Sequence, residues 1–194
     1  ASSLDSLVIG EREIITQVRK AFDECSKDGL TGSILQLLIN KTIESAKEVY
    51  TNTQIAKNPI SIVSLAYRKL RDLGIKDNSR ILVVGAGETN TRMCKFLSKH
   101  GLKNLTIFNR TFEKAEALSN QIGGNAMPLD ELSNFNEGFD LLVTCTGSED
   151  YLISPEIYQS LLAGESTKKT IIDLAIPYDV DPSVIQKNST NYIE

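Results

Sequence analysis

Residues 80–90 read RILVVGAGETN, and this stretch constrains the fold more than any other part of the chain. A short apolar run is typical of a buried strand, and Gly85 and Gly87 follow it directly. The residues after the glycines carry Met93, Phe96 and Leu97 at helical spacing. The pattern therefore predicts a strand, a tight glycine loop and a helix, which is the unit that builds parallel α/β sheets.

Further strand-like runs follow at 105–109 (LTIFN), 139–145 (FDLLVTC) and 169–175 (KTIIDLA). Residues 112–123 have the pattern of an amphipathic helix that ends at Gly123. Short apolar strands that alternate with helices imply a parallel sheet with right-handed crossovers. We therefore expect the α/β fold class, with a Rossmann-type domain over residues 56–194.

The first part of the chain has helical rather than strand-like patterns. Apolar side chains recur at helical spacing in two successive segments, and the polar stretch 51–59 separates them from the rest, with Pro59 suited to open a third helix. We expect residues 1–55 to form a separate helical domain. The two apolar faces comprise Ile14, Ile15, Val18, Ala21, Phe22 and Cys25, and then Leu35, Leu38, Ala46, Val49 and Tyr50.

The glycine loop predicts a dinucleotide site. In Rossmann loops the first glycine permits a tight turn, the second lets the backbone approach a pyrophosphate, and the third allows close packing of the helix on the strand. Gly85 and Gly87 supply the first two, whereas Asn90 replaces the third. A tight turn without a ligand is the alternative. The expected contacts to the cofactor from this loop are Gly85, Ala86, Gly87, Glu88, Thr89 and Asn90.

The end of the second strand indicates which dinucleotide binds. NAD sites usually carry an acidic residue there, but this chain has Asn109, Arg110 and Thr111, beginning 24 residues after Gly85 (109 − 85). A guanidinium with amide and hydroxyl groups suits a 2′-phosphate, although an exposed turn can carry the same residues. We expect NADPH, with Thr144, Thr146 and Gly147 giving it room and hydrogen bonds after the third strand-like run.

Charge and cysteine content exclude several classes of function. The net charge of −4 gives no basic surface typical of nucleic-acid binding, and no apolar run is long enough to span a membrane. The three cysteines form no C-x-x-C pair, so we expect free thiols in the cytoplasm. With a single histidine, His100, we expect no metal site. Cys25 and Cys94 are interpreted as structural, and Cys145 as a small buried thiol rather than a nucleophile.

Five segments, in one order along the chain, resemble the glutamyl-tRNA reductase family. The first and last are more specific than the glycine loop, which is shared with the wider shikimate-dehydrogenase-like group. The segments are SSLDSLVIGEREIITQVRKAF (2–22), ISIVSLAYRKL (60–70), VVGAGETN (83–90), FNRTFEKAEAL (108–118) and IIDLAIPYDVDP (171–182).

The resemblance implies NADPH-dependent reduction of glutamyl-tRNA(Glu) to glutamate-1-semialdehyde, the first step of the C5 route to 5-aminolevulinate, porphyrins and other tetrapyrroles. In that family a cysteine forms a thioester that accepts hydride from NADPH. Its Thr-Cys-Asn-Arg segment is absent from these 194 residues. We therefore expect the end of a truncated catalytic domain followed by an NADP-binding domain, inactive alone. The family also implies a homodimer through a C-terminal domain and possible channelling to glutamate-1-semialdehyde aminomutase.

By the same resemblance, Ser6, Glu11, Arg12, Glu13 and Gln17 match positions that line the glutamyl pocket. The family more often has Pro and Gln where this chain has Arg12 and Glu13, and Glu11 is also suited to stabilise a helix N-terminus. Tyr50 and Tyr178 replace arginines that are usual in the family.

Two alternatives remain open at this point. One is a shikimate-dehydrogenase-like NADP oxidoreductase with a small acid as its substrate. The other is an NADP-binding module without catalysis.

Overall fold

The computed structural model describes residues 1–4, 10, 13–53, 55 and 62–194, with side chains described from residue 67 onward in the last range. The chain divides into two compact units, Ala1–Leu65 and Ala66–Glu194. The expected boundary between residues 55 and 56 adjoins residues outside the described part of the chain, so it stays a prediction. Pro59, expected to open a third helix, itself lies outside the described residues.

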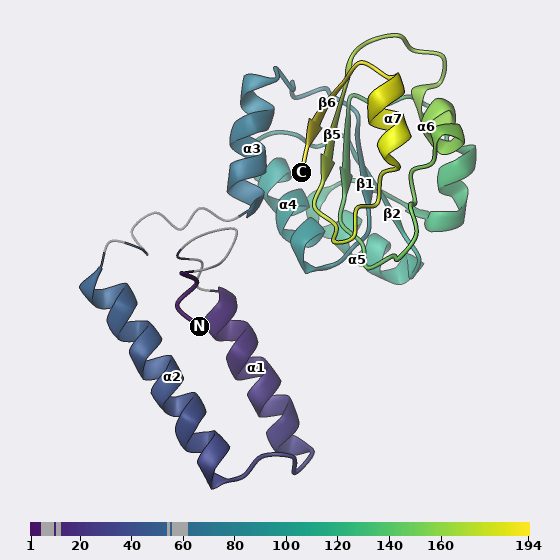
Figure 1. Ribbon diagram of the computed structural model, residues 1–194. Coiled ribbons are helices and arrows are strands. Elements are labelled where there is room, and N and C mark those ends of the chain that lie inside the picture. The colour runs from purple at the N-terminus through teal and green to yellow at the C-terminus, as the bar shows by residue number, and fades with distance from the viewer. Residues whose placement is uncertain (5–9, 11–12, 54, 56–61) are drawn as a thin grey trace. The chain divides into compact units, whose positions relative to one another are not determined.

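The first unit contains two long helices, α1 (Glu13–Lys27) and α2 (Ser33–Asn52), which run side by side in opposite directions (Figure 1). Both helices were expected from the spacing of apolar residues. Their apolar faces are only partly covered, however: α1 buries none of its residues, and α2 buries only Ile43 and Ala46. A pair of helices can cover only a narrow stripe on each partner, so Cys25 is exposed rather than packed in a core.

The second unit is built on a six-stranded parallel sheet with the strand order β3-β2-β1-β4-β5-β6 (Figure 1). This is the strand order of a Rossmann fold, and it confirms the α/β fold class. The four strands expected from the sequence are β1 (Ile81–Val84), β2 (Leu105–Asn109), β4 (Leu141–Thr144) and β5 (Lys169–Asp173). The two others, β3 (Asn125–Pro128) and β6 (Thr190–Ile193), form the edges of the sheet.

Helices cover both faces of this sheet. On one face, Leu82, Val84 and Phe108 pack in a cluster with residues of α6 (Pro155–Leu162) and α7 (Pro182–Lys187). The alternate residues of the same strands are also buried, and α4 (Glu88–Lys99) and α5 (Phe112–Ile122) contact the sheet at β1 and at β2 and β3. Both faces of the central strands are therefore covered, as expected of a parallel sheet.

Two further elements belong wholly or partly to the second unit. The 3-10 helix η1 (Leu129–Asn134) follows β3 and contacts α6. Helix α3 (Ile62–Asp72) begins before the division between the units, and the Tyr67 ring packs edge-on against Phe96 of α4 at 4.9 Å between centroids. This contact packs the later part of α3 against α4.

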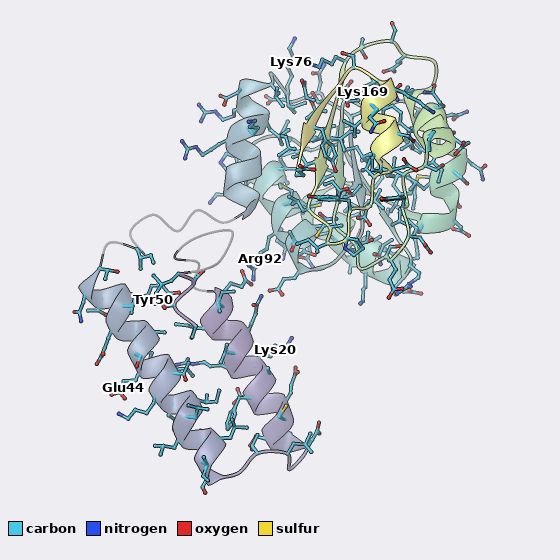
Figure 2. All side chains as sticks on the ribbon, viewed as in Figure 1. Lys20, Glu44, Tyr50, Lys76, Arg92 and Lys169 are labelled. Carbon is cyan, nitrogen blue, oxygen red and sulfur yellow. The ribbon has the colours of Figure 1, made fainter. Side chains whose placement is uncertain are left out.

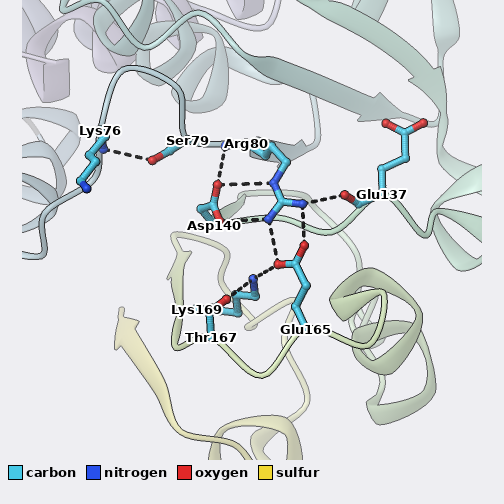
Figure 3. Close-up of polar contacts among 8 residues, drawn as sticks. All are labelled: Lys76, Ser79, Arg80, Glu137, Asp140, Glu165, Thr167 and Lys169. Carbon is cyan, nitrogen blue, oxygen red and sulfur yellow. Dashed lines mark hydrogen bonds and ion pairs between the residues drawn. The ribbon is translucent and has the colours of Figure 1, made fainter.

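A network of charged side chains joins the amino ends of β1, β4 and β5 (Figure 3). Arg80 donates to both carboxylate oxygens of Glu165, at 2.7 and 2.8 Å, and to Asp140 Oδ1 at 3.1 Å. Lys169, which Figure 2 labels in the second unit, donates to the same Glu165 oxygen (Oε2) that accepts from Arg80 Nη2. The Lys169 side chain is only 1% exposed. The network lies at the opposite end of the strands from the glycine loop, and it satisfies the buried lysine.

In the part of the chain that the structure describes, no helix combines the length and the apolar character that crossing a membrane requires.

Candidate functional site

A cavity of about 430 Å³ lies at the carboxyl ends of β1, β2 and β4. The strand order reverses between β1 and β4, and ligands of open α/β sheets bind in the crevice at such a switch point. The lining residues are Gly85, Ala86, Gly87, Asn109, Arg110, Thr111, Lys114, Leu129, Cys145, Thr146, Gly147, Ser148 and Leu152. Eight of these were predicted from the sequence as cofactor contacts.

Gly85 and Gly87 differ in what favours glycine at each position. Gly85 has φ +98°, and a Cβ there would lie 2.7 Å from the carbonyl oxygen of Cys145, so the fold itself requires glycine. Gly87 has an ordinary φ of −74°, and no atom lies within 4 Å of the place where its Cβ would be. Nothing within the described protein demands glycine at this position, whereas a ligand approaching the backbone would.

Asn90, the departure from the glycine pattern, lies fully buried in the first turn of α4. Its Nδ2 donates to the carbonyl oxygens of Val84 at 2.8 Å and Gly85 at 2.9 Å. These two hydrogen bonds connect the first turn of α4 to the end of β1 and to the first glycine of the loop. Asn90 is absent from the cavity lining, as are Glu88, which is exposed and paired with Arg92 at 2.6 Å, and Thr89.

The end of β2 brings two cations to the cavity. Arg110 and Thr111 are exposed and line it, and Lys114 joins them from the first turn of α5. Sequence reasoning missed Lys114, although its spacing of four residues from Arg110 in the same segment was a usable signal. Asn109 has an internal role as well, because its Oδ1 accepts from the Ala86 main-chain N–H at 2.9 Å and its Nδ2 donates to Thr111 O at 2.7 Å.

The loop after β4 forms the opposite wall. Thr146 is held by Asp179, whose Oδ2 accepts from the Thr146 N–H at 2.9 Å. Gly147 is exposed, with open space where a Cβ would lie. Thr144, by contrast, is fully buried at the end of β4 and does not line the cavity, and its hydroxyl has no partner among the described residues. The lining residues Leu129, Ser148 and Leu152 were not predicted.

Cys145 lines the cavity but is not set up as a nucleophile. Burial raises the pKa of its thiol; a hydrogen bond with Thr89 lowers it, and the carboxylates of Asp179 and Asp173 raise it further. The thiol donates to the Leu174 carbonyl oxygen at 3.4 Å. Because these surroundings disfavour the thiolate, they support the interpretation that Cys145 is not a nucleophile. The thiol was expected to be buried, but Cys145 is only half-buried, because it lies in the cavity wall. Burial likewise raises the pKa of Cys94 to about 12.

The residues expected to line a glutamyl pocket are only partly visible. Ser6, Glu11 and Arg12 lie outside the described residues. Glu13 is the half-buried first residue of α1, and Gln17 is exposed one turn further along the same helix. Their role in substrate binding stays a prediction.

Two family models match the chain, one in each unit. Residues 64–194 match the family described as shikimate / quinate 5-dehydrogenase, and residues 1–53 match the N-terminal domain of glutamyl-tRNA(Glu) reductase. The first match covers the whole parallel sheet and the cavity. The second covers both helices of the first unit.

Individual relatives match almost the entire chain. Glutamyl-tRNA reductase of Methylococcus capsulatus is 38% identical over 191 residues, which cover 96% of this chain and 45% of that protein. The enzyme of Methanosarcina mazei is 32% identical over 187 residues, covering 96% of this chain and 42% of that protein.

The solved structure of glutamyl-tRNA reductase from Methanopyrus kandleri superimposes with a TM-score of 0.62 at 31% identity, covering 99% of this chain and 49% of that one. The chain thus spans less than half the length of these relatives. By its match over residues 64–194 it belongs to the shikimate / quinate 5-dehydrogenase family with an NAD(P)-binding dehydrogenase-like domain, and over its whole length it is a homologue of glutamyl-tRNA reductase.

Proposed function

We propose that this chain is the NADPH-binding domain, with adjoining helices of the catalytic domain, of an enzyme that reduces glutamyl-tRNA(Glu) to glutamate-1-semialdehyde. The observation that carries the proposal is that similarity to glutamyl-tRNA reductases extends through both units, over 96% of the chain in two relatives. A shared cofactor domain alone would produce similarity only in the second unit. The reaction would place the protein at the first step of the C5 route to 5-aminolevulinate and porphyrins.

The glycine loop would hold the pyrophosphate of the cofactor. Helix α4 begins at Glu88 directly after Gly87, and its first main-chain N–H groups attract anions. The open space beside Gly87 leaves room for a phosphate to approach the backbone. The residues present therefore fit a dinucleotide, with Asn109 fixing the loop through Ala86.

Arg110 and Lys114 favour NADPH over NADH. They are the only charged residues among those that line the described cavity, and both are positive. A 2′-phosphate on the adenosine ribose would gain charge-assisted hydrogen bonds from them, with Thr111 beside them as a further donor. A cavity for NADH would instead offer a carboxylate to the free 2′-hydroxyl.

When bound, NADPH supplies the hydride of the proposed reaction. The residues of this chain bind and orient the cofactor, and Glu13 and Gln17, together with Ser6, Glu11 and Arg12, are proposed to border the glutamyl group. Burial disfavours the thiolate forms of Cys94 and Cys145, and the Thr-Cys-Asn-Arg segment of the family is absent from these 194 residues. We therefore expect these 194 residues to bind NADPH without reducing glutamyl-tRNA. A homodimer and transfer of product to glutamate-1-semialdehyde aminomutase are proposed for the full-length enzyme.

The test measures the dissociation constants of NADPH and NADH for the wild-type chain and for Arg110→Ala. The wild type should prefer NADPH by at least about tenfold, and Arg110→Ala should remove most of that preference while NADH binding stays the same. Arg71→Ala, which removes an exposed arginine from α3, serves as the matched control and should bind like the wild type. Equal affinity of the wild type for the two cofactors would refute the NADPH assignment.

A second candidate follows from the family match over residues 64–194, namely oxidation of a small hydroxy acid such as shikimate. We expect no NADP⁺-dependent oxidation of shikimate by the chain, because that match covers only the unit with the cofactor cavity. Turnover of shikimate would favour this candidate, and turnover of glutamyl-tRNA by the chain alone would contradict the expected inactivity.

A further inference from the structure

Asp179 is a buried carboxylate that holds the loop after β4 by its side chain. It is 0% exposed, and its two oxygens are used by one residue: Oδ2 accepts from the Thr146 main-chain N–H at 2.9 Å and Oδ1 accepts from the Thr146 hydroxyl at 2.5 Å. The Thr146 hydroxyl oxygen in turn accepts from the Ser148 N–H at 3.1 Å. Both donors of Thr146 are therefore committed to Asp179, and the turn from 146 to 148 has one defined shape.

The main chain of Asp179 holds the far end of the same loop. Its carbonyl oxygen accepts from the N–H groups of Leu152 at 2.8 Å and Ile153 at 3.0 Å. Residues 146 and 152, both in the cavity wall, are thus fixed by a single residue from a distant part of the chain. An isolated bridge between Ile153 and Val180 continues this pairing.

Asp179 is itself fixed to the end of β5. The carboxylate of Asp173 accepts from the Ala175 N–H at 3.1 Å and from the Val180 N–H at 3.0 Å, which closes the turn that carries Asp179. Burying a carboxylate costs free energy unless hydrogen bonds compensate it. Here both oxygens of Asp179 accept hydrogen bonds from the loop after β4. Asp173 therefore connects the end of β5 to the turn that carries Asp179, and Asp179 connects this turn to the cavity wall.

Gly147 lies at the centre of the fixed turn. It is exposed and lines the cavity, and its main-chain N–H and C=O make no hydrogen bond with the described residues. With Arg110 at the end of β2 and Gly87 after β1, a dinucleotide would place its adenosine and pyrophosphate over those strands. The nicotinamide half would then lie over the end of β4, beside Gly147.

We propose that Asp179 is a positioning residue that, by clamping Thr146, presents the main chain of Gly147 to the nicotinamide half of NADPH. This role rests on the proposed function, because it requires the dinucleotide to occupy the cavity. Asp179 contributes through the shape of the loop and does not touch the cofactor itself.

The experiment compares two probes that share the adenosine half. The first is NADPH, and the second is 2′-phospho-ADP-ribose, which keeps the 2′-phosphate and pyrophosphate but lacks nicotinamide. Asp179→Asn leaves only one acceptor oxygen for the two Thr146 donors, and Thr146→Val removes the hydroxyl at nearly constant shape. Thr146→Ser keeps the hydroxyl, and Asp181→Asn removes a charge from the same segment without altering Asp179.

Asp179→Asn and Thr146→Val should each weaken NADPH binding about tenfold and change binding of 2′-phospho-ADP-ribose less than about threefold. The wild type is expected to change the fluorescence of the bound nicotinamide, and at saturating NADPH both variants should lose this change. Thr146→Ser should restore both readouts, and Asp181→Asn should match the wild type. Thermal unfolding of each variant separates these effects from loss of the fold.

Equal weakening of both probes in folded variants would show a merely structural role and overturn the inference, as would unchanged NADPH binding in both variants. Failure of the proposed function has a different signature, because the wild type itself would then bind neither probe. In that case the positioning role falls together with the cofactor site.

Discussion

Asn109 Oδ1 accepts a hydrogen bond from the main-chain N–H of Ala86 at 2.9 Å, so the end of β2 fixes the glycine loop that follows β1. A residue expected to contact the cofactor is therefore also part of the frame that shapes the loop. Its amide completes the link by donating to the Thr111 carbonyl oxygen at 2.7 Å. The Asn109 side chain therefore connects the proposed pyrophosphate loop, through Ala86, to the proposed 2′-phosphate site, through Thr111.

Replacing Asn109 with alanine should weaken NADPH binding about fivefold to tenfold, because the loop loses the hydrogen bond that orients Ala86. The affinity for NADH should fall by a similar factor, since the loop serves both cofactors. Fluorescence titration of both cofactors measures the effect. Asn104→Ala is the matched control, because Asn104 is exposed and lies directly before β2; an equal loss of affinity there would show a general effect on this strand.

Gly87→Ala should separate ligand binding from stability. The φ of −74° is open to alanine and no atom lies within 4 Å of the new Cβ, so the free energy of unfolding should change by about 1 kcal/mol or less. NADPH affinity should nevertheless fall at least about tenfold, because the methyl group would fill the space in which the pyrophosphate comes close to the backbone. Gly32→Ala is a close control, since Gly32 also caps a helix with open space around it. Unchanged NADPH affinity in Gly87→Ala would contradict the placement of the pyrophosphate.

The central part of the fold was predictable because its signals are local. Strands β1 and β4 are buried on both faces, so they read as nearly continuous apolar runs, ILVV and LLVT. The edge strand β3 reads NAMP and is half-exposed, and it contains a proline, which central strands disfavour. Its strand character comes from pairing with β2, which a local pattern does not contain.

The candidate site, like the fold, has one part that was predictable from local sequence and one part that was not. Gly85, Gly87 and Arg110 belong to motifs within a short stretch, and their placement at one cavity follows from the parallel sheet. Asp179 holds Thr146 across 33 residues of sequence, so its contribution appears only once β4 and β5 are neighbours. Long-range contacts of this kind are the part that the sequence pattern leaves open.

Asn90→Gly would restore the glycine of the usual loop pattern, yet it should destabilise the domain. The substitution removes the two hydrogen bonds from Nδ2 to Val84 and Gly85 and adds a flexible residue to the first turn of α4. Together these effects should lower the free energy of unfolding by about 2 kcal/mol. Denaturation in urea measures the change. A variant as stable as the wild type would show that Asn90 is an incidental replacement.

The charged network at the other end of the sheet should make stability depend on pH. Hydrogen bonds from Arg80, and then from Lys169, lower the pKa of Glu165 from 4.5 to about 2. Between these values the unfolded chain binds more protons at Glu165 than the folded chain does. The free energy of unfolding therefore gains a contribution that is fully present above pH 4.5 and is lost as the pH falls toward 2.

Glu165→Gln should remove this contribution and flatten the stability profile over the same pH range, as measured by urea denaturation at a series of pH values. The variant should also be less stable at neutral pH, because Lys169, only 1% exposed, loses its carboxylate partner. Glu137 contacts Arg80 through its main-chain oxygen, so Glu137→Gln removes a carboxylate nearby while every contact in the network remains. If Glu165→Gln and Glu137→Gln have the same profile as the wild type, the low pKa of Glu165 does not contribute to the stability of the fold.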